Sequence, residues 1–312
     1  RKGSTEMTDA SVNRSSHRLV SPADLKALSQ RSDARGLARL ALHAGLIGLS
    51  SYAIWRTQGT LWVLPAMLVQ GLFLVTLFAT IHETVHYTAF RSRWLNETVG
   101  WLAALPSMLN STYYKHFHHA HHRHTQDPAR DPELTPPPPA TRGEFWWRIT
   151  AIPYWIGRFR SLGKLAAGNF KGADFVPEKA KPEVVRSVRL MITAYVLALG
   201  SAVALGSAWP VFYWIVPVML GQPFLRAYLL TEHTGCSEDS NGLTNTRTTL
   251  AAWPVRLLMW NMPFHVEHHL YPSIPFHALP ALHDKIRGDL VHVAPGYLPT
   301  LRDIHADLGR AT

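Results

Sequence analysis

Long apolar stretches alternate with polar stretches along this chain. Four apolar stretches, at about 36–55, 61–81, 188–205 and 209–230, approach the roughly 20 residues that cross a bilayer as a helix. The connector within each successive pair is very short, so the two helices of a pair must run antiparallel as a hairpin. The pattern therefore predicts an all-α integral membrane fold with four transmembrane helices in two hairpins.

Each hairpin returns the chain to the side from which it entered, so residues 1–35, 82–187 and 231–312 share one face. These regions hold seven, fourteen and six lysine or arginine residues, respectively, whereas the hairpin connectors hold one, Arg56. Positive charge marks the cytosolic side of a membrane protein. We therefore expect an inner (cytoplasmic) membrane protein with cytosolic termini: a tail at 1–35 and a single membrane domain at 36–312, with a cytosolic helical cap formed by 82–187 and 231–312.

Composition adds three constraints. The net charge of +10 is explained by this topology and by contact with anionic lipid. No nucleic-acid-binding motif accompanies the charge, so we expect no nucleic-acid partner. The single cysteine, Cys236, excludes an intramolecular disulfide. The first 35 residues contain no apolar stretch, so we expect no cleavable signal peptide.

The region between the two hairpins is not uniformly polar. Residues 101–109 are apolar but too short to span, which predicts an interfacial or re-entrant segment. Residues 144–165 mix aromatic and basic side chains, as an amphipathic helix at a membrane interface does. Residues 136–139 are all proline and predict a rigid linker.

Three histidine boxes lie on the predicted cytosolic face, and a further histidine follows the fourth span. Neutral imidazole is the commonest protein ligand for transition metals. On a helix, residues at i, i+3 and i+4 share one side, so each box presents two or three imidazoles together. Eight imidazoles are too many for one ion, which predicts that the cap holds a histidine-rich dinuclear metal site. The candidate ligands are His82, His86, His118, His121, His122, His265, His268 and His269, with His233 as the ninth.

The other histidines, and the carboxylates near the boxes, are expected to have different roles. His116, His119 and His124 lie in or beside the second box, and helical spacing places His119 off its ligand face. The remaining histidines are expected to be surface or packing residues: His17, His43, His277, His283, His292 and His305. Carboxylate or amide partners for the ligand imidazoles are expected among Glu83, Asp127, Asp131, Glu232, Asn261 and Glu267. Cys236 is interpreted as a buried spectator thiol.

Three longer stretches make the pattern specific. These are Tyr113–Leu134, Asn245–Thr249 and Trp260–Pro275, which together contain two of the boxes. With the two hairpins, they resemble the membrane fatty-acid desaturase and hydroxylase superfamily, in particular its bacterial branch. The resemblance implies that the nine histidines hold two iron ions and that O2 is the co-substrate. In the acyl-CoA desaturases of this superfamily, an Asn one turn before the extra histidine binds metal through water. This chain departs from that pattern, since it has Leu229 at that position.

The resemblance implies an oxidoreductase that desaturates or hydroxylates an unactivated C–H bond, with a fatty acyl or lipid substrate as the default. Related branches suggest an alternative: hydroxylation or O-demethylation of a carotenoid or a small polar substrate. The sequence contains no fused cytochrome b5 segment, no cysteine set for an iron–sulfur centre and no dinucleotide fingerprint. A separate electron donor, a ferredoxin or a similar carrier with its reductase, is therefore expected, together with contact with membrane lipid.

Two other classes of protein remain open. His82-Glu83-Thr-Val-His86 matches the HExxH motif of zinc proteases, in which Glu83 would be the general base. That interpretation leaves both HxxHH boxes unexplained. A metal transporter would suit the dense run from His116 to His124, but transporters place ionisable residues along a path at mid-membrane. The predicted spans contain few such residues, mostly near their ends.

Overall fold

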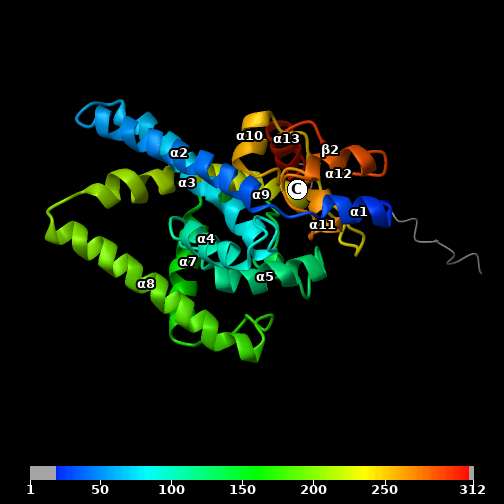
Figure 1. Ribbon diagram of the computed structural model, residues 1–312, viewed down its shortest axis with the longest axis horizontal. Helices are drawn as coiled ribbons and strands as arrows, with labels where there is room; N and C mark the ends of the chain where they lie inside the picture. The colour runs from blue at the N-terminus through cyan, green and yellow to red at the C-terminus, as the bar shows by residue number, and fades with distance from the viewer. Residues whose placement is uncertain (1–18, 309–312) are drawn as a thin grey trace, which may run out of the picture.

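The computed structural model of the protein describes residues 19–308, which are mainly helical (Figure 1). The α-helices are α1 (Pro22–Leu28), α2 (Asp33–Thr57), α3 (Val63–Val85), α4 (Arg93–Ala104), α5 (Ser111–His124), α6 (Arg142–Ile149), α7 (Ile152–Ala166), α8 (Lys181–Ala204), α9 (Val216–His233), α10 (Trp253–Leu258), α11 (His265–Leu270), α12 (Leu279–Ile286) and α13 (Tyr297–Asp307). The short 3-10 and π elements are η1 (Pro132–Leu134), η2 (Glu178–Ala180) and η3 (Val211–Ile215). Strands β1 (Thr248–Thr249) and β2 (Val293–Ala294) pair in parallel, with Thr248 opposite Val293.

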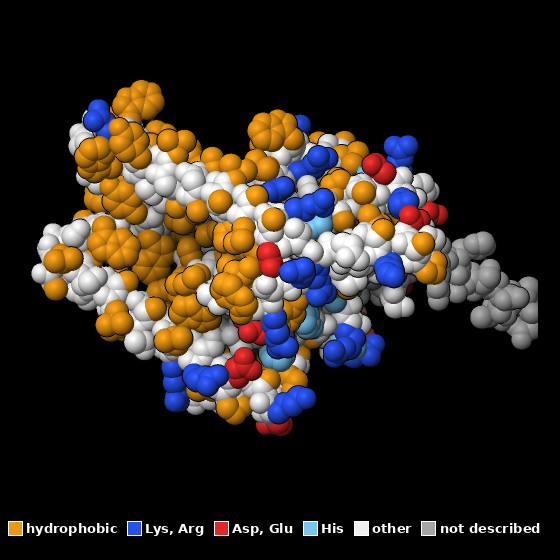
Figure 2. Space-filling model, viewed as in Figure 1, with side chains coloured by type: hydrophobic (Ala, Val, Ile, Leu, Met, Phe, Trp, Pro, Cys, Tyr) orange, Lys and Arg blue, Asp and Glu red, His pale blue; other side chains and the backbone are white. Residues whose placement is uncertain are grey.

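Three helical stretches in the described part of the chain are long and apolar enough to cross a membrane. They are α2, α3 and the continuous stretch Glu178–Ala204, which combines η2 and α8. They coincide with three of the four predicted spans. Large apolar side chains are exposed along α2 and α8, including Trp55, Val196, Leu197 and Val203. Figure 2 shows such side chains covering the part of the molecule that contains these helices.

The fourth predicted span, 209–230, falls on η3 and α9, which do not meet the same length and hydropathy conditions within residues 19–308. A π-helical turn interrupts this stretch at Val211–Ile215. Pro223 lies inside α9 and cannot donate a backbone hydrogen bond there. The same helix carries Arg226 and Glu232, which lower its hydropathy. A fourth membrane crossing therefore stays a prediction.

The region between the hairpins differs from expectation in two places. Residues 101–109 are the end of α4 and the turn after it, not a separate segment. The single amphipathic helix expected at 144–165 is two helices, α6 and α7. The break falls at Ala151, which has a left-handed φ of 60°, just before Pro153 in the first turn of α7. Apolar side chains on α7, including Ile152, Ile156 and Phe159, are exposed, as at a membrane surface.

Helix α3 is the centre of the fold, packed against α2, α4 and α9. It crosses α9 at two glycines, Gly71 and Gly221. A Cβ added at Gly221 would lie 2.4 Å from the carbonyl oxygen of Gly71, and one added at Gly71 would lie 2.0 Å from that of Pro217. Only glycine allows the two backbones to approach this closely. The crossing fixes the end of α3 relative to the end of α9.

The C-terminal part forms a smaller core beside this crossing. Phe264, Ile274, Leu279, Leu282 and Ile286 are buried together, and α11 packs against α12 and β1. Figure 1 shows α11 and α12 beside α1, at the end of the molecule away from the loop that joins α2 to α3. This packing places the third histidine box against the ends of α3 and α5.

Candidate metal centre

The first two boxes lie at helix positions that local sequence defines. Helix α3 ends in a Schellman motif: the N–H of Tyr87 donates to the carbonyl of Thr84, and the N–H of Thr88 donates to that of Glu83. Tyr87 has a left-handed φ of 57°. Asn110 caps the N-terminus of helix α5, because its side-chain oxygen accepts from the N–H of Tyr113 at 3.0 Å. The boxes therefore lie on ordered helices and not on loops.

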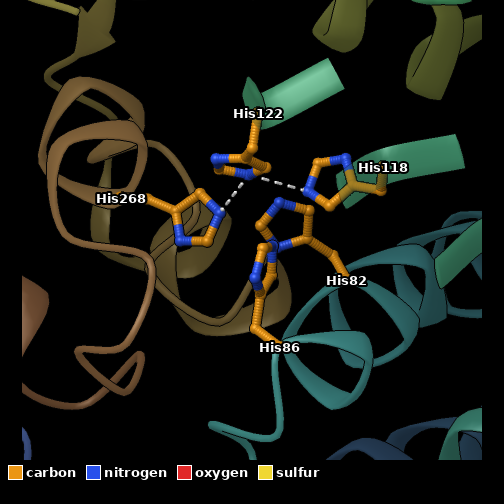
Figure 3. Close-up of side chains that lie close together, drawn as sticks. All are labelled: His82, His86, His118, His122 and His268. Atoms are coloured by element: carbon orange, nitrogen blue, oxygen red, sulfur yellow. Dashed lines mark hydrogen bonds between the residues drawn. The ribbon is translucent and has the colours of Figure 1, made fainter. Parts of the chain in front are cut away.

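A first cluster of imidazoles gathers histidines from three helices (Figure 3). One ligand atom from each lies within 4.8 Å of all the others, in a set formed by His82 and His86 of α3, His118 and His122 of α5, and His268 of α11. The Nε2 atom of His122 is 3.0 Å from Nε2 of His118 and 3.0 Å from Nε2 of His268. Histidines from three boxes that are distant in the sequence thus meet at one point.

A second cluster adjoins the first. It contains His121, His233 and His269, again with one ligand atom each within 4.8 Å. His265 lies beside it, with Nε2 at 3.1 Å from Nε2 of His233. The rings of His122 and His269 stack with centroids 4.2 Å apart, which joins the two clusters. All nine candidate ligands therefore lie in one centre, divided into two groups.

In the second cluster, Nδ1 of each ring is held by a hydrogen bond from outside the cluster, and Nε2 faces the other candidate ligands or Glu133. His121 Nδ1 donates to Asp131, 3.0 Å from both carboxylate oxygens. His233 Nδ1 donates to the carbonyl of Asn245 at 3.0 Å. His269 Nδ1 is 3.3 Å from Thr125 Oγ1, which already donates to a backbone carbonyl and so accepts here. Such bonds fix the ring orientation of metal-binding histidines and direct Nε2 at the ion.

The residues present fit a pair of metal ions. Buried polar atoms in proteins almost always have a hydrogen-bond partner. Here eight of the nine histidines have a buried ring nitrogen that lacks one: His82, His86, His118, His121, His122, His265, His268 and His269. Nitrogens 3.0 Å apart suit joint coordination at a metal–nitrogen distance of about 2.0–2.1 Å. An all-imidazole set suits iron, zinc, copper or nickel.

Burial also keeps the imidazoles in the form that binds metal. Loss of solvation lowers the pKa of His118, His122, His265, His268 and His269 well below the ordinary value, with neighbouring imidazoles adding to the effect. These rings are therefore neutral at physiological pH, as ligation requires. For His121, burial is outweighed by the carboxylates of Glu133 and Asp131, which raise its pKa.

Two carboxylates stand at the edge of the clusters. Glu232 was expected there, and its Oε1 is 3.6 Å from Nδ1 of His265. Glu133 was missed: its carboxylate is 3.6 Å from Nδ1 of His118 and 3.7 Å from Nε2 of His121. Burial raises the pKa of Glu133. Its position two residues after Asp131, in the stretch that follows the second box, was the available signal.

Other expected partners lie elsewhere. The prediction that Asp127 supports a ligand was wrong. Its carboxylate accepts from Nε of Arg130 at 2.6 Å and contacts no candidate ligand. The same prediction for Asn261 was also wrong, since its side-chain amide donates to the carbonyl of Phe276. Glu83 accepts from Thr88 Oγ1 and the N–H of Phe276 and lies 3.8 Å from His82 Nδ1.

The carboxylate of Glu267 faces away from the clusters. It accepts from Thr248 Oγ1 and from His283 Nδ1. His283, expected to be a surface or packing residue, thus anchors the third box. Glu83 is fully buried, and both of its donors bond Oε2, whereas Oε1 has no hydrogen-bond partner and lies 3.8 Å from Nδ1 of His82.

The histidines beside the second box stay outside both clusters. In the described part of the chain, neither group includes His116, His119 or His124. His119 Nε2 bonds the carbonyl of Val85 at 3.1 Å, off the ligand face as predicted. His43 is buried and bonds the carbonyl of Phe73, a packing role. Cys236, expected to be buried, is half-buried, and this partial burial raises the pKa of its thiol. His17 lies outside the described residues.

A cavity of about 430 Å³ leads from the clusters to α6 and α7. His82, His118 and His265 line its inner end. Its wall is mostly apolar and aromatic, and includes Phe78, Leu109, Tyr114, Leu229 and Met262. Three arginines also line the cavity: Arg148, Arg158 and Arg226. Mostly apolar lining with a few placed polar groups is the usual composition of a small-molecule site.

Comparison with known proteins agrees with this geometry. The family described as fatty acid desaturase matches residues 59–300 of the chain. Among similar proteins are three called sn-1 oleoyl-lipid 12-desaturase. The one from a Synechocystis species is 23% identical over 79% of this chain and 73% of its own length. Those from Anabaena variabilis and a Picosynechococcus species are 22% and 25% identical, over 84% and 78% of this chain and 80% and 73% of their lengths.

Proposed function

Because this chain belongs to the fatty acid desaturase family, it is a membrane oxidoreductase, and we propose that it introduces a double bond into a lipid acyl chain with O2 as co-substrate. The observation that carries the proposal is the gathering of nine buried or half-buried histidines, five of which line a mostly apolar cavity. Two iron ions held by these nine histidines would supply the O2 chemistry.

The reaction balances with one external source of electrons. A –CH2–CH2– unit gives up two hydrogen atoms and becomes –CH=CH–. O2 takes up these two hydrogens, two electrons from a carrier and two protons, and leaves as two molecules of water. The chain's own residues position the acyl chain and keep solvent away from the reacting carbon. Phe78, Tyr114 and Met262 suit that role, because their apolar surfaces lie beside His82 and His118.

The substrate assignment rests on the relatives and on the cavity together. The three similar proteins are named for action on an oleoyl chain in a lipid. The apolar wall of the cavity suits an acyl chain better than a small polar molecule. Leu229 also lines it and offers no polar atom to hold water near His233. Hydroxylation of the same carbon is the alternative outcome. Analysis of the reaction products would distinguish it from desaturation.

We further propose four membrane crossings, with both termini and the metal centre in the cytosol. The distribution of basic residues supports this orientation. Electrons would come from a separate acidic carrier such as a ferredoxin. Arg91, Arg93 and Arg123 are exposed near the ends of α3 and α5, and Lys115 lies beside them. Figure 2 shows basic side chains gathered around histidines on this side of the molecule. Such a basic face attracts an acidic protein.

The first test is the metal content of detergent-purified protein by elemental mass spectrometry. We expect about two irons per chain and their loss in the His268→Ala variant, which removes a nitrogen 3.0 Å from His122. Acyl lipid is then supplied with ferredoxin, its reductase and O2, and the products are analysed by mass spectrometry. A new double bond is expected. One zinc per chain, no iron and no O2-dependent product would overturn the proposal.

A further inference from the structure

The arginines that line the cavity are not explained by the proposed chemistry. Arg158 of α7 and Arg226 of α9 both lie over the Tyr154 ring, with guanidinium carbons 5.4 and 4.4 Å from its centroid. Tyr154 is held in place because its hydroxyl donates to the carbonyl of Ser107 at 2.5 Å. The two guanidinium groups thus share one rigid support at the cavity wall.

Neither guanidinium has a counter-ion. Both Nε atoms are buried without a hydrogen-bond partner, and neither side chain forms an ion pair with another described residue. Arg148 differs, since it donates to the carbonyls of Pro136 and Pro137. Burying part of a charged group without a partner is costly, and two like charges side by side add repulsion. An anion between Arg158 and Arg226 would relieve both costs.

The cavity's own carboxylates do not fill this role. Glu133 and Glu232 also line it, but they lie 3.6 Å from His118 and His265, respectively. Arg226 precedes His233 by seven residues, about 10 Å along helix α9. The charge of Arg226 acts on Glu133 and Glu232, but neither carboxylate forms an ion pair with Arg226 or Arg158.

We propose that Arg158 and Arg226 bind a carboxylate or phosphate of the substrate, so that the cavity accepts an acyl chain with an anionic head in preference to a neutral lipid. Guanidinium forks match the oxygens of both anions. The inference rests on the proposed function for the identity of the chain, and adds the charge of its head. Helix α7 carries exposed apolar side chains, so Arg158 lies where lipid head groups are found.

The test is a binding titration that needs no turnover. Purified full-length protein in neutral detergent is titrated with cis-parinaric acid, a fluorescent fatty acid, and with its methyl ester. We expect the acid to bind about tenfold more tightly than the ester. Arg158→Gln and Arg226→Gln should each remove most of this preference and leave ester binding unchanged. Arg226→Lys should retain part of it. Arg160→Gln, an exposed arginine on the same helix, is the matched control and should change neither affinity.

Competition then identifies the source of the anion. Unlabelled oleate, a dioleoyl phosphatidylglycerol and the neutral dioleoylglycerol are compared as displacers of the acid. Stronger displacement by oleate assigns the anion to a free carboxylate, and stronger displacement by the phospholipid assigns it to a head-group phosphate. Either result supports the subsite. Equal binding of acid and ester by the wild-type protein overturns it, whether or not the variants fold. If no desaturation is found but the preference holds, only the chemical assignment fails.

Discussion

At the scale of single residues, the two ring nitrogens of each histidine in the second cluster have separate roles. His121, His233 and His269 each use Nδ1 to bond Asp131, the Asn245 carbonyl or Thr125. Nε2 is then the nitrogen left for an ion, because a neutral imidazole carries only one proton. The first cluster lacks comparable partners: both nitrogens of His82 are buried and unpartnered. The second group is therefore the more rigidly prepared of the two.

Asp131 provides a direct test of that preparation. Asp131→Asn keeps the shape but removes the charge that orients His121, so metal binding should weaken roughly 10- to 100-fold. The measurement is iron retained per chain after dialysis against graded chelator. Asp127→Asn is the matched control, because Asp127 is paired with Arg130 and contacts no candidate ligand. Equal retention in the two variants would show that Asp131 does not support the site.

His283 should matter for stability, contrary to expectation from the sequence. It donates to Glu267, which is fully buried within the third box. His283→Ala leaves that carboxylate with Thr248 as its remaining side-chain donor and should cost about 1–3 kcal/mol. A lower unfolding temperature of the detergent-solubilised protein would be seen. His292→Ala removes a half-exposed histidine of the same region and should leave the temperature unchanged; an equal drop in both variants contradicts the assignment.

At the scale of helices, the crossing of α3 and α9 assembles the centre. Helix α3 carries His82 and His86, and α9 ends at His233. Their backbones approach at Gly71 and Gly221, where no side chain intervenes. Any added volume at this point must push the two helices apart, because each glycine faces backbone atoms that cannot rotate away. The separation would then be transmitted to ligands at the ends of both helices.

Gly221→Ala is therefore expected to destabilise the protein by about 1–3 kcal/mol or more and to reduce bound metal. The measurements are the unfolding temperature and the iron content of the same preparation. Gly48→Ala in α2 is the control, since a Cβ there meets no atom within 4 Å. That change should be neutral or slightly stabilising, as alanine favours helix over glycine. Normal iron content in Gly221→Ala would mean that the crossing does not position the ligands.

How much of the fold and the candidate site could be predicted from the sequence depends on how far apart in the chain the interacting residues lie. Box spacing and long apolar stretches are local signals, and they predicted α2, α3, α8 and the gathering of nine histidines. The break at Ala151 and the π turn in η3 depend on packing between helices, although Pro153 was a local warning. Glu133, Thr125 and the Asn245 carbonyl reach the site only through the fold. No spacing rule connects residue 245 to His233 or residue 283 to Glu267.

At the scale of the whole molecule, two surfaces of opposite character meet at the metal centre. Apolar side chains cover the long helices, and basic side chains gather on the cap (Figure 2). The cavity reaches α7, which lies between these surfaces and carries exposed Ile156 and Phe159. Under the proposed function, an acyl chain would enter from the membrane while a soluble carrier would approach from the basic side. The two reactants need not compete for one entrance.

This division predicts how electron delivery responds to charge. Electrostatic steering accelerates association and weakens as ionic strength rises. Reduction of the loaded enzyme by reduced ferredoxin, followed by stopped-flow absorbance, should slow as salt is increased from about 0.01 to 0.5 M. Arg123→Glu should slow it at low salt by about tenfold and flatten the salt dependence, because Arg123 is exposed beside the second box.

Arg56→Glu is the control that also tests topology. It makes the same charge reversal in the connector between α2 and α3, which the proposed orientation places across the membrane from the centre. A ferredoxin added to one side of a reconstituted vesicle cannot sense that charge through a hydrocarbon layer of about 30 Å, since screening already acts within about 10 Å at 0.1 M salt. Slowing by Arg56→Glu equal to that by Arg123→Glu would place both residues on one side and contradict the hairpin. An effect confined to Arg123→Glu would support both the orientation and the basic face as the side of electron entry.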